Sequence, residues 1–234
     1  MSRGHQRRPV SEEVWLGWRT VMPACLAVLP LGLALGVLVV QSGLAWWWGP
    51  VFAAVVLAGS LEFLLVGMVA AVAPLTQIAV STLLVNFRHV FYALSFPLHR
   101  IHGRAAKAYS TFALTDEAYA LTATPRATGW SRTRILSVQV LFHLAWVASV
   151  AIGTALGALV PPQVVGLDFA VTALFVVLGI DAYRIRRSLP LPVLALGCAL
   201  AAALVTPNDM LLSAMGLFIG ALVASYLVTR RRRA

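Results

Sequence analysis

Charged residues are scarce in this sequence. Lys, Arg, Asp and Glu together make up 11% of the 234 residues, and only 8 residues are acidic, whereas hydrophobic residues make up 60%. A water-soluble fold of this length could not bury so much apolar surface. The composition therefore excludes an ordinary soluble protein and indicates that lipid is the solvent for most of the chain.

Motifs of catalysis and of ATP use are also missing. The sequence has only two cysteines, both in apolar stretches, so a disulfide framework is not expected. It contains no glycine-rich phosphate-binding loop, no His and Cys spacing typical of a metal site, and no nucleophile elbow. These absences argue against an ATP-driven pump and a conventional hydrolase. We expect no enzyme activity and no cofactor, and any energy used would come from an ion gradient.

Long apolar runs make up most of the chain. A helix that spans a bilayer needs about 20 mostly apolar residues. The runs that fulfil this requirement are 21–42, 50–73, 135–160, 166–183, 189–206 and 209–229. Two more segments, 75–97 and 108–123, are long enough but carry polar residues at their centres. The expected fold is an all-α, polytopic membrane bundle, with a transmembrane domain over 21–229 between basic tails at 1–20 and 230–234.

Positive charge is concentrated between the apolar runs. Every Lys and Arg except Arg88 lies in a tail or in a connection next to an apolar run, and the connections 43–49, 161–165 and 207–208 contain none. Basic flanks mark the cytoplasmic side, so we expect a multi-pass protein of a bacterial inner membrane with cytoplasmic N- and C-termini. This distribution argues against nucleic-acid binding, which the net charge of +10 would otherwise suggest.

The basic connection at 98–107 bears on the two polar segments. If both segments crossed the membrane completely, this connection would lie outside, against the charge rule. The sequence therefore favours broken or re-entrant segments at 75–97 and 108–123, and eight full crossings remain the alternative. Either arrangement places these segments against the bundle interior, because irregular backbone at membrane depth must be covered by protein or water.

A cluster of polar side chains interrupts the segment 75–97. Asn86, Arg88 and His89 stand within four residues of one another, with apolar residues on both sides. A charged side chain at mid-bilayer costs at least about 2.5–3.5 kcal/mol. An interfacial anchor would need Arg88 to reach the headgroups, and the apolar flanks leave little room for that. We interpret this cluster, with Tyr92 on an adjoining helical face, as part of a site for substrate or protons.

Two adjacent carboxyl groups lie at the centre of the other polar segment. Asp116 and Glu117 cannot both ionise cheaply in a medium of low dielectric constant. Arg88 is an obvious partner for them. Such a pair serves either a structural purpose or transport, and both interpretations stay open.

Two further carboxyl groups are isolated in apolar runs. Glu62 lies between Gly59 and Gly67, small residues that let another backbone approach or let the helix unwind. It would bind a substrate ammonium group or a coupling proton, or else form a plain hydrogen bond as a neutral acid. Asp168 begins the run 166–183, where it is either a helix cap or part of the same site.

The remaining features concern helix packing. His143, with Gln139 one turn before it and Trp146 on the same side, is interpreted as part of a satisfied buried cluster. Pro30 predicts that the first span is kinked or interrupted. Glycines four residues apart permit close approach of two helices, and they occur at Gly32 and Gly36, Gly153 and Gly157, and Gly216 and Gly220.

Taken in order, these motifs resemble the AzlC-type branched-chain amino acid permeases, the larger subunit of bacterial two-component exporters. The resemblance covers roughly residues 20–230. It rests on Pro30-x-Gly32-x-x-x-Gly36, Ala58-Gly59-Ser60-Leu61-Glu62-Phe63, Asn86-x-Arg88-His89-x-x-Tyr92, Leu114-Thr115-Asp116-Glu117 and Gly166-Leu167-Asp168-Phe169. Many members of that family carry glutamine at the position of Glu62, so a role for this carboxyl group need not extend to the family.

The resemblance implies export of leucine, isoleucine or valine, driven by the proton gradient, together with a small AzlD-type membrane subunit. In such a secondary transporter, Arg88 or a broken-helix N-terminus would hold the carboxylate of an aliphatic amino acid. Glu62 or the pair of Asp116 and Glu117 would meet its ammonium group and pass protons. From the residues alone, an uncoupled channel-like pore for small solutes and a non-transporting membrane scaffold stay open.

Overall fold

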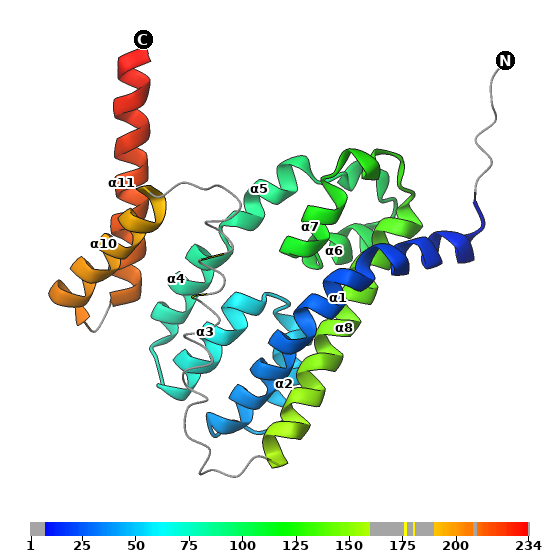
Figure 1. Cartoon of the computed structure of the whole chain (residues 1–234), viewed down its shortest axis with the longest axis horizontal. Coiled ribbons are helices and arrows are strands. Elements are labelled where there is room, and N and C mark those ends of the chain that lie inside the picture. Colours follow the sequence, from blue (N-terminus) through cyan, green and yellow to red (C-terminus); the bar gives the residue numbers. More distant parts are fainter. Residues whose placement is uncertain (1–7, 160–175, 177–179, 181–189, 208–209, 234) are drawn as a thin grey trace. The chain divides into compact units, whose positions relative to one another are not determined.

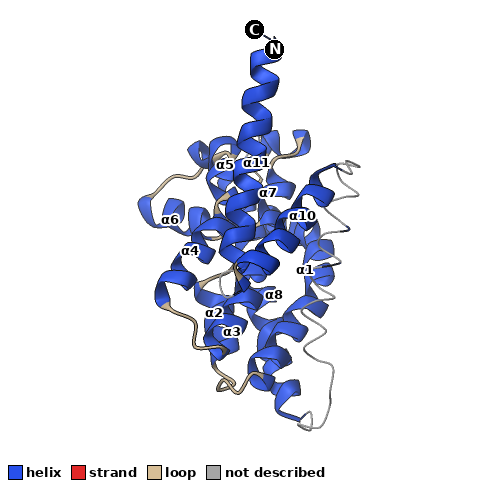
Figure 2. Cartoon of the chain, turned by 90° about the vertical axis from the view of Figure 1, so that its left-hand side faces the viewer, coloured by secondary structure: helices blue, strands red, loops and turns tan. Residues whose placement is uncertain are grey.

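The computed structural model describes residues 8–159, 176, 180, 190–207 and 210–233. Within these ranges every regular element is a helix, as Figure 2 shows, which confirms the all-α expectation. The chain divides into two compact units. One unit comprises residues 1–72 and 86–168, and the other comprises 73–85 and 169–234.

The first unit contains most of the helices. They are α1 (Val10–Gln41), α2 (Trp48–Val55), α3 (Gly59–Ala70), α5 (Arg88–Ser95), α6 (Arg104–Phe112), α7 (Asp116–Thr122) and α8 (Arg132–Leu159). Two short 3₁₀ helices, η1 (Leu98–Arg100) and η2 (Pro125–Gly129), precede α6 and α8. The second unit contains α4 (Leu75–Asn86) up to Val85, and a pair of helices that pack against each other, α10 (Pro190–Val205) and α11 (Met210–Arg233).

Helices α1 and α8 form the centre of the first unit and lie side by side (Figure 1). Glycines bring their backbones together: Gly36 faces the backbone of Val150 on α8, and Gly153 faces the backbone of Leu33 on α1. Without a hydrophobic force between helices in lipid, such close van der Waals packing is a main source of association. The close-packing interpretation is thus confirmed for the first two glycine pairs. A Cβ atom at Gly216 or Gly220 would meet no atom of the described residues within 4 Å.

Among the described residues, two helices are long and apolar enough to cross a membrane. They are α1 and α8, which contain the expected spans 21–42 and 135–160 except for the last residue of each. Shorter apolar helices occur over Gly59–Ala70, Pro190–Val205 and Leu212–Leu227. The expected span 166–183 lies outside the described residues except for two positions. The count of six spans therefore stays a prediction.

The structure corrects two expectations about helix continuity. First, α1 runs unbroken through Pro23 and Pro30, which excludes an interruption at Pro30, and a kink there stays a prediction. It also begins at Val10, within the predicted N-terminal tail. Second, the run 50–73 is not one helix, because α2 ends at Val55 and α3 begins at Gly59. Leu57 between them has a φ of 48°, a left-handed conformation that no helix can continue through.

Both polar segments are broken, as predicted. The segment 75–97 is divided at Phe87 between α4 and α5, and the segment 108–123 is divided at 113–115 between α6 and α7. Thr115 explains the second break, since its side chain accepts a hydrogen bond from the amide of Ala118 and caps α7. The re-entrant path of these segments through the membrane stays a prediction.

Candidate functional site

Three helices of the first unit have a polar residue at their first or second position. Ser60 is the second residue of α3, Arg88 is the first residue of α5, and Asp116 is the first residue of α7. Each lies just after a break in the chain, where main-chain amides have no partner within the helix. The breaks therefore expose polar backbone at the same places where the sequence has its polar side chains.

Arg88 joins the three helix starts. Its Nη1 atom lies 3.0 Å from Oδ2 of Asp116, and its Nη2 atom donates to Oγ of Ser60 over 3.1 Å. Both charged side chains are 42% exposed. The predicted pairing of Arg88 with the carboxyl groups of the second polar segment is therefore confirmed for Asp116. One guanidinium group holds α3, α5 and α7 together and remains accessible.

Tyr92 holds the second oxygen of the Asp116 carboxylate. Its hydroxyl group donates to Oδ1 over 2.9 Å, so each carboxylate oxygen has its own partner. The Tyr92 ring stacks on the ring of Tyr119, with centroids 4.3 Å apart and planes at 10°. The hydroxyl group of Tyr119 in turn lies 2.8 Å from Oγ of Ser95. This stack packs the start of α7, with Asp116, against α5.

Glu62 forms a separate cluster. Its side chain is fully buried, and Oε1 accepts a hydrogen bond from the amide of Ala58 over 2.8 Å. The indole Nε1 of Trp146 on α8 lies 3.1 Å from Oε1 and 3.2 Å from Oε2. Glu62 therefore contacts the break before α3 and the central helix α8. It lies two residues from Ser60 in the chain, and its hydrogen bonds in the described structure do not include Arg88.

The other predicted site residues have different surroundings. His89 turns its Nδ1 atom to the carbonyl oxygen of Asn86 at 3.0 Å, and its ring meets Tyr92 edge to face at 5.4 Å. Glu117 is partly buried on α7. Among the described residues, Arg88 forms its ion pair with Asp116, the residue before Glu117. Asp168 lies outside the described residues.

The predicted cluster of Gln139, His143 and Trp146 is divided among three partners. Gln139 accepts from Oγ of Ser110 over 2.7 Å and donates to two main-chain carbonyl oxygens of the α6 end. His143 lies 3.2 Å from the hydroxyl group of Tyr109, and Trp146 binds Glu62. The interpretation of hydrogen-bonded buried groups was correct for Gln139 and Trp146. Gln139 and His143 share α6 as their partner helix, whereas Trp146 bonds to α3.

Sequence reasoning missed the roles of two residues. Ser60 was noted only as part of a family motif. Its hydroxyl group beside Gly59 in an apolar run could have indicated a polar contact. Trp146 was assigned to a buried cluster on its own helix, because the spacing along α8 contains no information about its partner on α3. Both contacts join residues far apart in the chain, by 28 and 84 positions.

The sequence of this chain matches a known protein family. The family model described as AzlC protein matches residues 23–160, a range that contains Ser60, Glu62, Arg88, Asp116 and Trp146. The chain belongs to the AzlC family. This match confirms the resemblance to the AzlC-type permeases.

Relatives of known sequence are similar over most of the chain. The branched-chain amino acid transport protein AzlC of Bacillus subtilis is 29% identical over 90% of this chain and 85% of its own length. A membrane protein of Haemophilus influenzae is 28% identical over 87% of this chain and 85% of its length. The inner membrane protein YgaZ of Escherichia coli is 25% identical over 79% of both chains. No solved structure matches the chain.

AzlC membership makes this chain a transmembrane protein involved in transport, since its relatives are membrane and transport proteins by name. This agrees with the apolar composition and with the two long apolar helices α1 and α8. Family membership also points to a transport protein rather than an enzyme.

Proposed function

We propose that this chain is a secondary transporter that exports branched-chain, aliphatic amino acids across a bacterial inner membrane, coupled to protons. A small AzlD-type subunit would act with it, and both chain termini would lie in the cytoplasm. The name of the Bacillus subtilis relative supports the substrate class. The observation that carries the proposal is the position of Arg88, accessible and held between Ser60 and Asp116 at three helix starts.

Arg88 suits the carboxylate group of an amino acid. A guanidinium group can donate two parallel hydrogen bonds to a carboxylate. Discontinuous helices in transporters present their N-terminal, positive ends to the anionic group of a substrate. Arg88 and Ser60 lie in the first turns of α5 and α3. A substrate carboxylate would therefore displace Asp116 from Arg88 and gain support from these two helix starts.

Asp116 supplies the link to protons in this proposal. When the substrate carboxylate takes over Arg88, the Asp116 carboxylate loses its cation and keeps only the hydrogen bond from Tyr92. It would then receive either the substrate ammonium group or a proton. Glu117 next to it offers a second carboxyl group, and His89 and Asn86 complete the polar end of the site. Asp168 is a further candidate from the run 166–183.

An efflux experiment tests the function. Cells that express the chain with its small partner are loaded with radioactive leucine, isoleucine or valine, and the initial rate of efflux is measured. Arg88→Gln should lower this rate by at least about tenfold, since hydrogen bonds to charged groups contribute about 1.5–3 kcal/mol. The control Arg126→Gln removes the same charge from an exposed residue of η2 and should leave the rate unchanged.

The rival functions are distinguished in the same cells. Equal retention of amino acids in expressing and empty cells would count against amino-acid export. Efflux that persists undiminished after collapse of the proton gradient would favour an uncoupled pore. Full efflux in a variant in which Glu62, Arg88 and Asp116 are all neutralised would remove these residues from the mechanism and favour a scaffold.

The topology has a test of its own. His102, exposed between η1 and α6, is replaced by cysteine in a chain whose Cys25 and Cys198 have been changed to alanine. A membrane-impermeant maleimide should label this position only after the cells are permeabilised, because basic connections stay in the cytoplasm. Labelling from outside would support eight full crossings.

A further inference from the structure

Among the described residues, Glu62 is the buried acidic residue that the proposed substrate site does not use directly. Its side chain has no exposed surface, whereas Arg88 and Asp116 are each 42% exposed. A substrate that reaches Arg88 therefore meets Ser60 and Asp116 without touching Glu62. The role of Glu62 must be sought in the groups that surround its carboxylate.

Both partners of the Glu62 carboxylate are hydrogen-bond donors. The amide of Ala58 donates to Oε1, and the indole group of Trp146 points between the two oxygens. A main-chain amide and an indole can only donate. Within the described residues no hydrogen bond runs from Glu62 to an acceptor. The site therefore requires an acceptor at position 62.

The break before α3 explains why an acceptor is needed there. Leu57 is in the left-handed region, and the amide of Ala58 has lost the helical acceptor that a continuous helix would provide. An amide without a partner is costly in the interior of a membrane protein. Glu62 satisfies this amide from the first turn of the next helix, as the acidic residue of a capping box does.

The second bond ties this helix start to α8. Trp146 lies so close to α3 that a Cβ atom on Gly59 would be 3.3 Å from its ring. Gly59 directly precedes Ser60, whose hydroxyl group accepts from Arg88. A shift of the Trp146 indole group relative to α3 would therefore also shift Ser60. The acceptor at position 62, the indole group and the small residue together define where α3 begins.

We propose that Glu62 is a positioning residue, which clamps the start of α3 to Trp146 and so holds Ser60 against Arg88. This inference rests on the proposed transport function. It assigns proton transfer to the accessible Asp116 and leaves Glu62 with the role of an acceptor. A glutamine side chain has a carbonyl oxygen that can accept both hydrogen bonds, so the charge of Glu62 is dispensable and its acceptor is not.

Three variants separate an acceptor from a proton carrier in the efflux assay. Glu62→Gln should keep the initial rate within about threefold and should keep the same dependence on the proton gradient. Glu62→Leu and Trp146→Phe, which remove the acceptor and the donor, should each lower the rate by about tenfold or more. Glu62→Gln with a rate as low as that of Glu62→Leu, or with a lost dependence on the gradient, would overturn the inference.

A double variant tests whether Glu62 acts through Ser60. Ser60→Ala alone should lower the rate, and Ser60→Ala combined with Glu62→Leu should be no slower than Glu62→Leu alone, because coupled residues are not additive. Independent, multiplied losses would mean that Glu62 acts by another route and would refute the positioning role.

A spectroscopic measurement separates this inference from the transport proposal. The full chain is labelled with 5-fluorotryptophan, and Trp146→Phe identifies the fluorine resonance of Trp146. This resonance should keep its shift in Glu62→Gln and move in Glu62→Leu. An unmoved resonance in Glu62→Leu overturns the clamp. A moved resonance in a chain that transports no branched-chain amino acid supports the clamp and refutes only the transport proposal.

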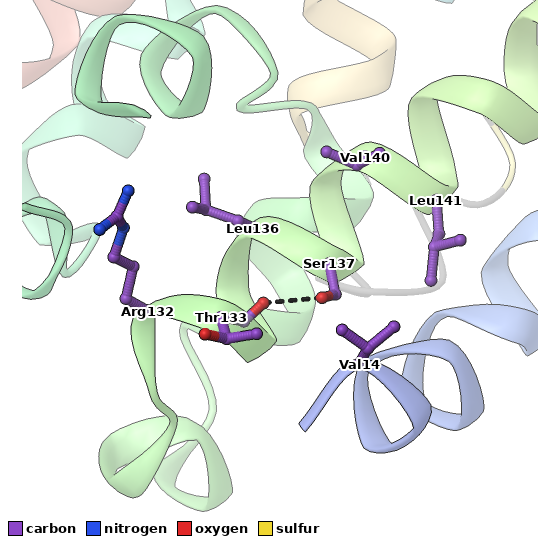
Figure 3. Close-up of a pocket in the computed structure, with 7 residues that line it drawn as sticks. All are labelled: Val14, Arg132, Thr133, Leu136, Ser137, Val140 and Leu141. Carbon is purple, nitrogen blue, oxygen red and sulfur yellow. Dashed lines mark hydrogen bonds between the residues drawn. The ribbon is translucent and has the colours of Figure 1, made fainter. Parts of the chain in front are cut away.

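A second inference concerns the groove between the first turns of α1 and α8, which Figure 3 shows. Its lining residues are Val14, Arg132, Thr133, Leu136, Ser137, Val140 and Leu141. Arg132, at the start of α8, is exposed, and the aliphatic residues follow it along the helix. Ser137 already donates to the carbonyl oxygen of Thr133 over 2.7 Å. The groove is therefore cationic at one end and apolar at the other.

The neighbourhood of this groove is typical of a membrane interface. Trp15 and Trp18 on α1 are exposed, and Arg19 lies over the Trp15 ring at 4.7 Å. The guanidinium group of Arg134 already donates a hydrogen bond to the Thr20 hydroxyl group over 2.9 Å. We infer that the groove binds an anionic phospholipid, with the phosphate at Arg132 and an acyl chain along Leu136 and Val140.

Lipid retention tests this site. The full chain is purified from membranes into nanodiscs of phosphatidylcholine with a minor fraction of phosphatidylglycerol, and the lipids that stay bound are measured by native mass spectrometry. Arg132→Gln should lower the retained phosphatidylglycerol by about tenfold, and Arg126→Gln should not change it. Equal retention in the two variants would refute the site. Displacement of the lipid by inorganic phosphate alone would also refute it, because the acyl chain would then contribute nothing.

Discussion

Replacement of Gly153 by alanine tests the packing of the two central helices. Gly153 lies on α8 where this helix meets α1, and the atoms opposite are main-chain atoms of Leu33. A Cβ atom built on Gly153 would lie 2.8 Å from Cα and 2.9 Å from the carbonyl carbon of Leu33, with the carbonyl oxygen closer still. Main-chain atoms in a helix cannot turn aside as a flexible side chain can.

The distance gives the size of the effect. Ordinary van der Waals contact begins at 3.4 Å, so the two backbones must separate by at least 0.6 Å, the difference between 3.4 and 2.8 Å. A separation of this kind loosens the neighbouring contacts of Gly36 and Gly157 as well. Overpacking of a close interface costs about 1–3 kcal/mol, and we expect Gly153→Ala to lower the free energy of unfolding by this amount.

Unfolding in mixed detergent micelles measures this change. The matched control is Gly67→Ala on α3, because a Cβ atom there would meet nothing within 4 Å. The control should unfold at or above the wild-type midpoint, since alanine favours a helix more than glycine does. The variant Gly36→Ala combined with Gly153→Ala should cost less than the sum of both, because one separation accommodates both methyl groups. A midpoint of Gly153→Ala equal to that of the control would refute the packing.

Two further predictions concern hydrogen bonds of the first unit. Tyr92→Phe keeps the aromatic ring but removes the bond to Asp116, and it should lower the initial rate of leucine efflux by about threefold to tenfold while the thermal unfolding midpoint stays near that of the wild type. Gln139→Leu leaves Ser110 and the α6 end without their buried partner and should lower the free energy of unfolding by about 1–3 kcal/mol, whereas Val140→Ala, a partly exposed neighbour, should cost less. Equal destabilisation by the last two variants would contradict the assigned bonds.

The helical fold was predictable because it depends on local requirements. Apolar runs identified α1 and α8, and the polar centres of 75–97 and 108–123 indicated that those segments would be broken. The break at 56–58 was harder to foresee. The run 50–73 is apolar throughout that stretch, and the left-handed conformation of Leu57 leaves no mark in the amino-acid type.

The sequence predicted the residues of the candidate site better than it predicted their contacts. Arg88 was predicted to pair with Asp116 and Glu117, because a cation in an apolar segment needs an anion, and the structure forms the ion pair with Asp116. Glu62 was assigned to the same site because an isolated carboxyl group in a membrane span is a candidate for binding a substrate ammonium group or a proton. The structure instead surrounds its carboxylate with the donors of Ala58 and Trp146, and charge alone could not distinguish these arrangements.

By itself, the sequence determined that lipid surrounds this protein and that its backbone is helical, because transfer to hydrocarbon and main-chain hydrogen bonding act on each segment separately. Only the tertiary structure decided which polar groups meet. Ser60 reaches Arg88 across 28 positions, and Trp146 reaches Glu62 across 84. Such pairs depend on how glycine-lined helices pack and on where the chain leaves a helix, and neither property follows from the spacing of residues along one segment.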